Sequence, residues 1–122
     1  MRIAIPPIRQ RKSIQKNLEV YFDTHKLPYF NRAIKAICKY YKLPTPVVEW
    51  YEYLRWGTVI GLTHENGKIH LVHPENWKKG RKYNTMEQWI NAVYHELGHY
   101  ILWTDPERKA DKFAEYMSKG VK

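Results

Sequence analysis

The order of hydrophobic patterns along the chain predicts a single small α+β domain. Apolar residues recur at helical spacing in the first third of the chain and again in the last third. The segment between them is rich in β-branched and aromatic residues and contains an Asn66-Gly67 turn signal. A chain of 122 residues is long enough for one such domain and too short for two ordinary ones. We therefore expect one domain over 1–122, with a three-stranded, mainly antiparallel sheet.

Two helices are expected before the first strand. After an extended start, Ser13 can cap a short helix that ends near Asp23. Pro28 suits the first turn of a second helix, which Pro44 stops. The apolar stripe of this second helix includes Cys38, which we interpret as a small core residue, and the helix should back the core.

Three strands are expected next. The segments 47–53 and 58–63 have β character, and the Asn66-Gly67 turn after the second predicts a hairpin with a returning strand over 68–73. Pro74 ends that strand, and the polar residues that follow it are expected to form a loop.

Two more helices are expected after this loop. Thr85 and Gln88 match a capping box for a helix that runs to about Trp103. After a tight turn at 104–106, a last helix should reach about Ser118. Its buried face is expected to consist of Ala110, Phe113, Ala114 and Met117.

The first of these helices carries the sequence H-E-L-G-H at 95–99. His95 and His99 lie four residues apart on one helical face, so both imidazoles can reach one metal ion, and Glu96 can reach a metal-bound water. Ala92 and Gly98 flank the motif and are expected to leave room for metal and substrate. The opposite, core-facing side should consist of Met86, Trp89, Ile90, Val93, Leu97, Tyr100 and Ile101.

Chance can place two histidines at this spacing in a chain with six. The mid-helix position and the acidic helix that follows nevertheless favour a metal site. A single cysteine excludes a Cys-based cluster, so His and carboxylates must hold the metal. Catalytic zinc needs a third protein ligand. Glu107 and Asp111, one turn apart, can serve as ligand and as partner of a ligand histidine, although Glu107 can also simply offset the helix dipole.

The HELGH motif followed by a helix reading E-R-K-A-D-K-F-A resembles the gluzincin metallopeptidases, and is especially similar to ImmA/IrrE-like domains and minigluzincins. The resemblance covers most of 28–118, where a backing helix, three strands, an active-site helix and a glutamate helix follow the family's minimal scaffold. Residues 1–27 would then be an N-terminal extension with a short helix, and 119–122 a tail.

The resemblance implies that His95, His99 and Glu107 bind Zn²⁺, that Glu96 is the general base, and that Asp111 orients a ligand histidine. If the turn at 104–106 reverses the chain, Glu107 lies beside the His99 end of the active-site helix and Asp111 beside His95. The connection between His99 and Glu107 is far shorter than in most gluzincins. The choice between Glu107 and Asp111 as third ligand therefore stays open.

The activity implied is that of a zinc-dependent endopeptidase, active or latent, which hydrolyses a protein or peptide through a metal-activated water. Glu96 would take the proton and return it to the leaving amine. Three residues are candidates for an oxyanion helper, and none can be singled out: His70, His73 and Tyr116. The returning strand is expected to offer an edge to which an extended peptide adds.

The chain carries 21 Lys and Arg against 12 Asp and Glu, a net charge of +9. A local cluster near the start consists of Arg9, Arg11, Lys12 and Lys16. Because the basic residues as a whole are spread along the sequence, we interpret them mainly as a solvated surface. One loop cluster beside Trp77 and Tyr83 could bind nucleic acid weakly through phosphates: Lys78, Lys79, Arg81 and Lys82. The apolar runs are too short to span a bilayer or form a signal peptide, so we expect a cytoplasmic protein without a membrane partner.

Two other functions stay open. A basic DNA-associated metalloprotein would resemble the SprT-like metalloproteases, which usually use a third histidine, although no histidine follows His99. An inactive regulatory protein could keep the same fold and bind a partner. The sequence does not predict the oligomeric state.

Overall fold

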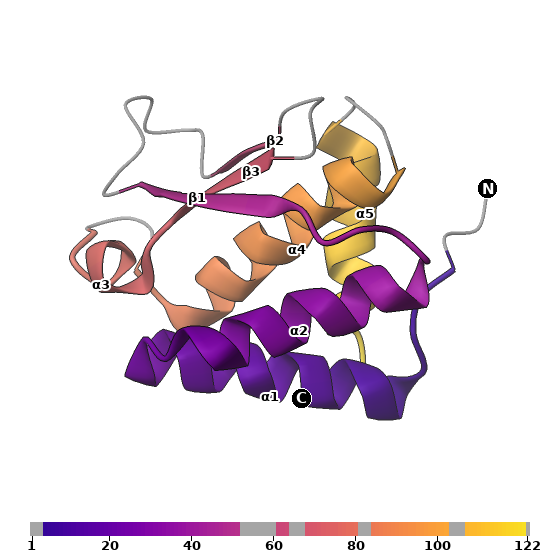
Figure 1. The fold of residues 1–122 in the computed structure, drawn as a ribbon, viewed down its shortest axis with the longest axis horizontal. Helices are drawn as coiled ribbons and strands as arrows, with labels where there is room; N and C mark the ends of the chain where they lie inside the picture. The colour runs from indigo at the N-terminus through magenta and orange to yellow at the C-terminus, as the bar shows by residue number, and fades with distance from the viewer. Residues whose placement is uncertain (1–3, 52–60, 64–67, 81–83, 103–106, 122) are drawn as a thin grey trace.

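A computed structural model describes residues 4–51, 61–63, 68–80, 84–102 and 107–121. The α+β class is confirmed. In Figure 1, α1 and α2 lie side by side, α4 runs between this pair and the sheet, and α5 packs beside α4. The elements follow in this order: α1 (Ile8–Thr24), α2 (Leu27–Tyr40), β1 (Val47–Tyr51), β2 (Gly61–Thr63), β3 (Lys68–Val72), α3 (Pro74–Trp77), α4 (Met86–Leu102) and α5 (Glu107–Ser118).

The sheet is mixed, in the order β1-β3-β2. β2 and β3 are antiparallel, with Leu62 opposite His70, as the predicted hairpin requires. β1 is parallel to β3, with Val48 opposite Ile69, so the expectation of a mainly antiparallel sheet was wrong. β1 and β2 are neighbours in the sequence, but β3 lies between them in the sheet. The parts of 47–53 and 58–63 beyond β1 and β2 lie outside the described residues.

Helix α1 begins well before the predicted cap. The backbone N–H of Arg11 donates to the carbonyl of Pro7 at 2.9 Å, which starts the helix immediately after the proline. Ser13 therefore lies inside the helix and is not its cap. Helix α2 begins as predicted, with Pro28 in its first turn.

The capping box of α4 is confirmed. The backbone N–H of Gln88 donates to Thr85 Oγ1 at 3.2 Å, and the backbone N–H of Thr85 donates to Gln88 Oε1 at 3.2 Å. The loop expected before it begins instead with α3. The His73 side chain caps this short helix, because its Nδ1 accepts from the backbone N–H of Glu75 at 3.1 Å.

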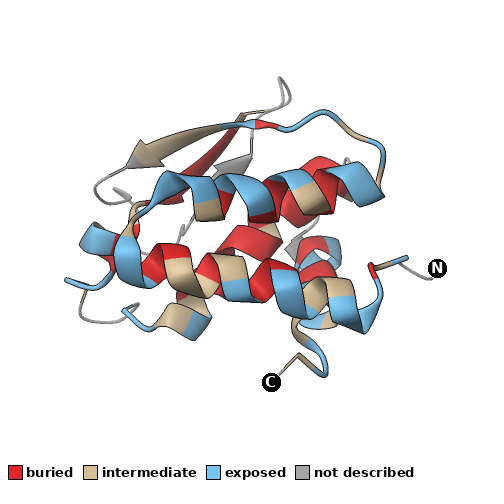
Figure 2. Ribbon diagram, turned by 60° about the horizontal axis from the view of Figure 1, so that its bottom comes forward, coloured by how far each residue is buried: buried red, intermediate tan, exposed pale blue. Residues whose placement is uncertain are grey.

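The core lies where α1, α2, α4 and the sheet meet. Figure 2 shows that the buried parts of α1 and α2 alternate with exposed ones along each helix. Aromatic rings join these elements, with ring centroids 5.2 Å apart for Tyr21 and Phe30 and 5.8 Å apart for Tyr21 and Trp89. Cys38 is buried as predicted, and burial raises its thiol pKa to about 11. In the described part of the chain, no helix is long and apolar enough to span a membrane.

The predicted core faces of α4 and α5 are confirmed. Of the seven core-facing positions predicted on α4, only Met86 is half-buried and the others are buried. The four predicted on α5 are at most 1% exposed: Ala110, Phe113, Ala114 and Met117. The polar motif of α4 consequently stays on the side that α5 borders.

Candidate metal centre

His95 and His99 face each other one turn apart on α4. Their Nε2 atoms are 3.2 Å apart, and their ring centroids are 4.9 Å apart in an edge-to-face arrangement. Both side chains are half-buried. Two ring nitrogens at this separation can share one ligand.

The separation fits zinc. Tetrahedral zinc with Zn–N bonds of about 2.0–2.1 Å holds its ligand nitrogens about 3.3 Å apart, close to the 3.2 Å between the two Nε2 atoms. Imidazole nitrogen is also a donor that zinc prefers in proteins. The two histidines therefore match the ion in both distance and chemistry.

Asp111 fixes the outer side of His95. Its Oδ1 lies 2.8 Å from His95 Nδ1, across the contact between α5 and α4. An Nδ1–H donated to this carboxylate places the lone pair of the neutral ring on Nε2, which is the nitrogen that faces His99. Asp111 thus has the geometry of a residue that orients a ligand.

Glu96 completes the group from the buried side. Its residue is only 3% exposed, and one carboxylate oxygen lies within 4.8 Å of a ring nitrogen of each histidine. The carboxylate is therefore close enough to both rings to belong to the same metal site. Among the described residues, only His95, Glu96 and His99 form a group of three His, Cys, Asp or Glu side chains close enough to hold a metal.

Gly98 brings α5 close to α4, a role that the sequence interpretation missed. A Cβ at this position would lie 3.1 Å from the Cα of Ala110 and 3.1 Å from the Cβ of Phe113. Gly98 had been expected to leave room for metal and substrate, but the space beside it is filled by α5. A glycine inside a helical pattern was the available signal of close helix packing.

The Glu107 side chain lies outside the described residues, although α5 begins at this residue. Its assignment as third ligand stays a prediction. Asp111 Oδ1 contacts His95 at Nδ1, which is not the ring nitrogen that faces His99.

The three candidate oxyanion helpers lie in different places. His70 Nε2 pairs with Glu49 Oε2 at 3.0 Å. Glu49 lies between Val48 and Trp50, whose side chains face α2, so the Glu49 side chain is on the opposite face of the sheet. His70 is the register partner of Glu49 on β3 and lies on that same face. His73 caps α3 and packs at 5.7 Å from the Trp50 ring.

The carbonyl of Tyr116, the third candidate, accepts from Arg11 Nη1 at 3.0 Å, near the start of α1. These contacts place none of the three candidates beside the His95 and His99 rings. The assignment of an oxyanion helper therefore has no support from them.

The substrate edge differs from expectation, whereas the structure describes only part of the loop patch and does not test it. β3 is the central strand, so it offers no free edge, whereas β2 pairs only with β3 in the described part of the sheet. Lys78 Nζ lies 4.7 Å above the Phe22 ring and 3.3 Å from His25 Nε2. Lys79 is exposed, and Arg81 and Lys82 lie outside the described residues.

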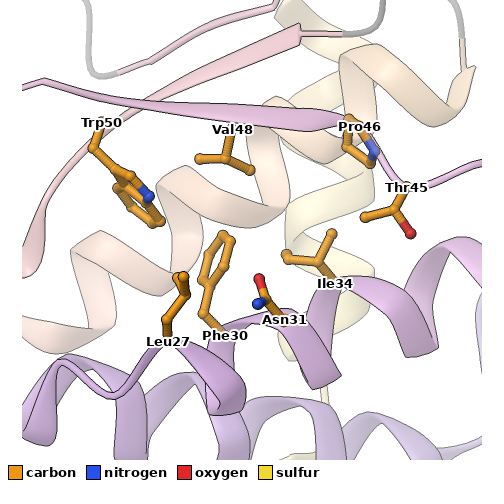
Figure 3. Close-up of a pocket in the computed structure, with 8 residues that line it drawn as sticks. All are labelled: Leu27, Phe30, Asn31, Ile34, Thr45, Pro46, Val48 and Trp50. Carbon is orange, nitrogen blue, oxygen red and sulfur yellow. The ribbon is translucent and has the colours of Figure 1, made fainter.

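A separate pocket lies between α2 and β1, with a volume of about 150 Å³. Figure 3 shows Phe30, Ile34 and Trp50 pointing into it, with Asn31 and Thr45 as its polar lining. The residues that line it carry no carboxylate, imidazole, amine or thiol, and Thr45 is the one hydroxyl among them. Among the described residues, the group of side chains that could hold a metal therefore lies on α4 and not in this pocket.

The candidate centre thus comprises three parts: a histidine pair, a buried carboxylate beside it and an aspartate that fixes one ring. All four side chains come from the two helices α4 and α5. No protein-family model, curated protein or solved structure matches this chain.

Proposed function

We propose that this chain is a zinc-dependent peptidase in which His95 and His99 bind the metal and Glu107 completes the ligand set. One observation carries the proposal: Asp111 contacts Nδ1 of His95 while Nε2 of the same ring faces Nε2 of His99. The HELGH spacing alone can arise by chance. A carboxylate that fixes the outer nitrogen of one ring supports a metal site, because ligand histidines are oriented in this way.

Zinc in this site would activate a water molecule and polarise the scissile carbonyl. Glu96 is the general base: it takes a proton from the attacking water as the new C–O bond forms. The same carboxyl then gives that proton to the amine nitrogen as the C–N bond breaks, so Glu96 returns to its starting state. Its low exposure supports this role, because the carboxylate is held next to the reacting atoms and away from bulk water.

The substrate is an extended peptide segment that pairs with the outer edge of β2. Two observations support this placement: β2 has β3 as its one neighbour among the described strands, and it packs against α4. Backbone hydrogen bonds would give most of the binding energy and little sequence preference. We therefore expect unfolded protein to be a better substrate than folded protein.

Hydrolysis of a denatured protein by the wild type and by Glu96→Gln tests the proposal. The wild type should cleave it and lose activity with a chelator, whereas Glu96→Gln should keep zinc and fold but lose hydrolysis. Activity of Glu96→Gln at the wild-type rate would contradict the mechanism. Zinc bound without hydrolysis by the wild type would favour an inactive regulatory protein.

A further inference from the structure

The helix pair α1 and α2 carries most of the net charge of the chain. Residues 8–42 contain nine Lys and Arg, with Glu19 and Asp23 as the acidic residues, which gives +7 of the total +9. The positive charge is therefore concentrated in this helix pair, whereas the sequence had been interpreted as spreading it along the chain.

The fold gathers this charge at one end of the helix pair. α1 and α2 run antiparallel and are joined at residues 25–26, so residues equally far from this turn lie at the same level. Arg9 is then level with Lys42, Lys12 with Lys39, and Lys16 with Lys35. We call these six residues the basic face: Arg9, Lys12, Lys16, Lys35, Lys39 and Lys42.

Every residue of the basic face is exposed. Figure 2 shows exposed segments of both helices on the side turned away from the core. Among the described residues, the ion pairs join Glu49 to Lys68 and His70, and Asp111 to His95, and none involves the basic face. Like charges four residues apart, such as Lys12 and Lys16, repel each other on a helix. A polyanionic partner would relieve this repulsion.

The dimensions of the basic face suit a duplex. Arg9 to Lys16 covers about 10 Å along a helix axis, and packed helices lie about 8–10 Å apart. Duplex DNA presents one phosphate charge per about 1.7 Å of its axis, so a stretch of this length offers about six. We propose that the basic face binds double-stranded DNA through its phosphates, without reading the base sequence.

The apolar residues near the basic face argue against a lipid surface or a single strand. The large exposed apolar residues at this end are Ile8 and Tyr40, where Tyr40 packs edge-to-face on Tyr41 at 4.9 Å. The other large apolar side chains of α1 and α2 that reach this half point into the core, among them Ile14 and Ile37. In the described chain, this face therefore presents neither an apolar wedge for acyl chains nor a row of rings for unpaired bases.

The basic face is remote from the metal centre. Tyr94 of α4 points toward α1 and donates to Gln15 at 3.5 Å, whereas His95 contacts Asp111 on α5. DNA binding should consequently be independent of zinc and of Glu96. The proposal does not rest on the peptidase function, and either can fail without the other.

The test is binding of a short fluorescent DNA duplex by the full chain across a salt series. We compare the wild type with the quadruple variant Lys12→Gln, Lys16→Gln, Lys35→Gln and Lys39→Gln. At about 0.1 M salt, affinity should fall at least about a hundredfold, and the slope of log K against log salt should become shallower by about 3.

The matched control removes the same charge elsewhere, with Lys26→Gln at the opposite end of the helix pair and Arg108→Gln, Lys109→Gln and Lys112→Gln on α5, all exposed positions. It should keep affinity within a few-fold of the wild type. Equal losses in both variants would show that net charge alone drives binding and would overturn the proposal. So would tighter binding to phosphatidylserine vesicles or to a single strand, or no wild-type binding at low salt.

Discussion

His95 Nδ1 lies 2.8 Å from Asp111 Oδ1, so helices α4 and α5 are joined at the proposed metal ligand itself. In the proposed zinc site, this contact would give Asp111 an indirect part in binding the metal. Asp111 holds the His95 ring in one orientation through Nδ1 and leaves Nε2, the nitrogen that faces His99, uncovered by its own carboxylate.

Asp111→Ala should therefore weaken zinc binding by about 10 to 100-fold without unfolding the chain, because the Asp111 side chain is 67% exposed. Glu107→Ala should weaken it much more, since it removes a ligand. Competition titration with a zinc chelator measures both. A larger loss for Asp111→Ala than for Glu107→Ala would reverse the two assignments.

Gly98→Ala should separate α4 from α5. The added Cβ meets the backbone of Ala110 and the side chain of Phe113 at 3.1 Å, and overpacking of this kind costs about 1–3 kcal/mol. Alanine favours a helix over glycine by about 1 kcal/mol, so the free energy of unfolding, from denaturant titration, should fall by the overpacking cost less this gain. Asn91→Ala, at an exposed position of the same helix, is the control and should change stability little. Wild-type stability for Gly98→Ala would show that the two helices can move apart freely.

Thr85→Ala and Ser13→Ala form a second matched pair. Thr85 caps α4 through its Oγ1, so its loss should cost about 0.5–2 kcal/mol in the free energy of unfolding. Ser13 lies inside α1, where alanine is the better helix former, so Ser13→Ala should be neutral or slightly stabilising. If Ser13→Ala were the more damaging change, α1 would begin at the serine after all.

His73 should make stability depend on pH. Burial lowers its pKa, and the charges of His25 and Lys78 lower it further, while Glu75 acts in the opposite direction. The unfolded chain then binds the proton more readily, so stability should fall as the pH drops below about 6.5 and level off below the folded pKa. His73→Asn should keep a cap for α3 and flatten this slope. Urea titrations at several pH values measure it, and an unchanged slope in the variant would exclude His73 as the cause.

Local signals predicted the part of the chain that carries the candidate centre. The capping box at Thr85 and Gln88, the apolar stripe of α4 and the HELGH spacing each depend on residues within a few turns of one another. The structure of α4 therefore agrees with what these local patterns predicted. For the same reason, Pro28 correctly marked the start of α2.

Contacts between distant segments could not be predicted in the same way. The parallel pairing of β1 with β3 joins segments that are distant in the sequence, with Val47 opposite Lys68, and no local pattern within either strand encodes it. Gly98 beside Phe113 requires knowing that α5 packs on that side of α4. Arg9, Lys12 and Lys16 already form a cluster in the sequence, but they meet Lys35, Lys39 and Lys42 only when α1 and α2 are folded against each other.

Zinc content of the purified chain tests the central claim most directly. Elemental analysis after dialysis against a weak chelator should find about one zinc per wild-type chain, and also per chain of Glu96→Gln, because Glu96 is a base and not a ligand. His95→Ala and His99→Ala should each lose the metal while circular dichroism shows that the helices remain. Full zinc occupancy in either histidine variant, or no zinc in the wild type, would contradict the account.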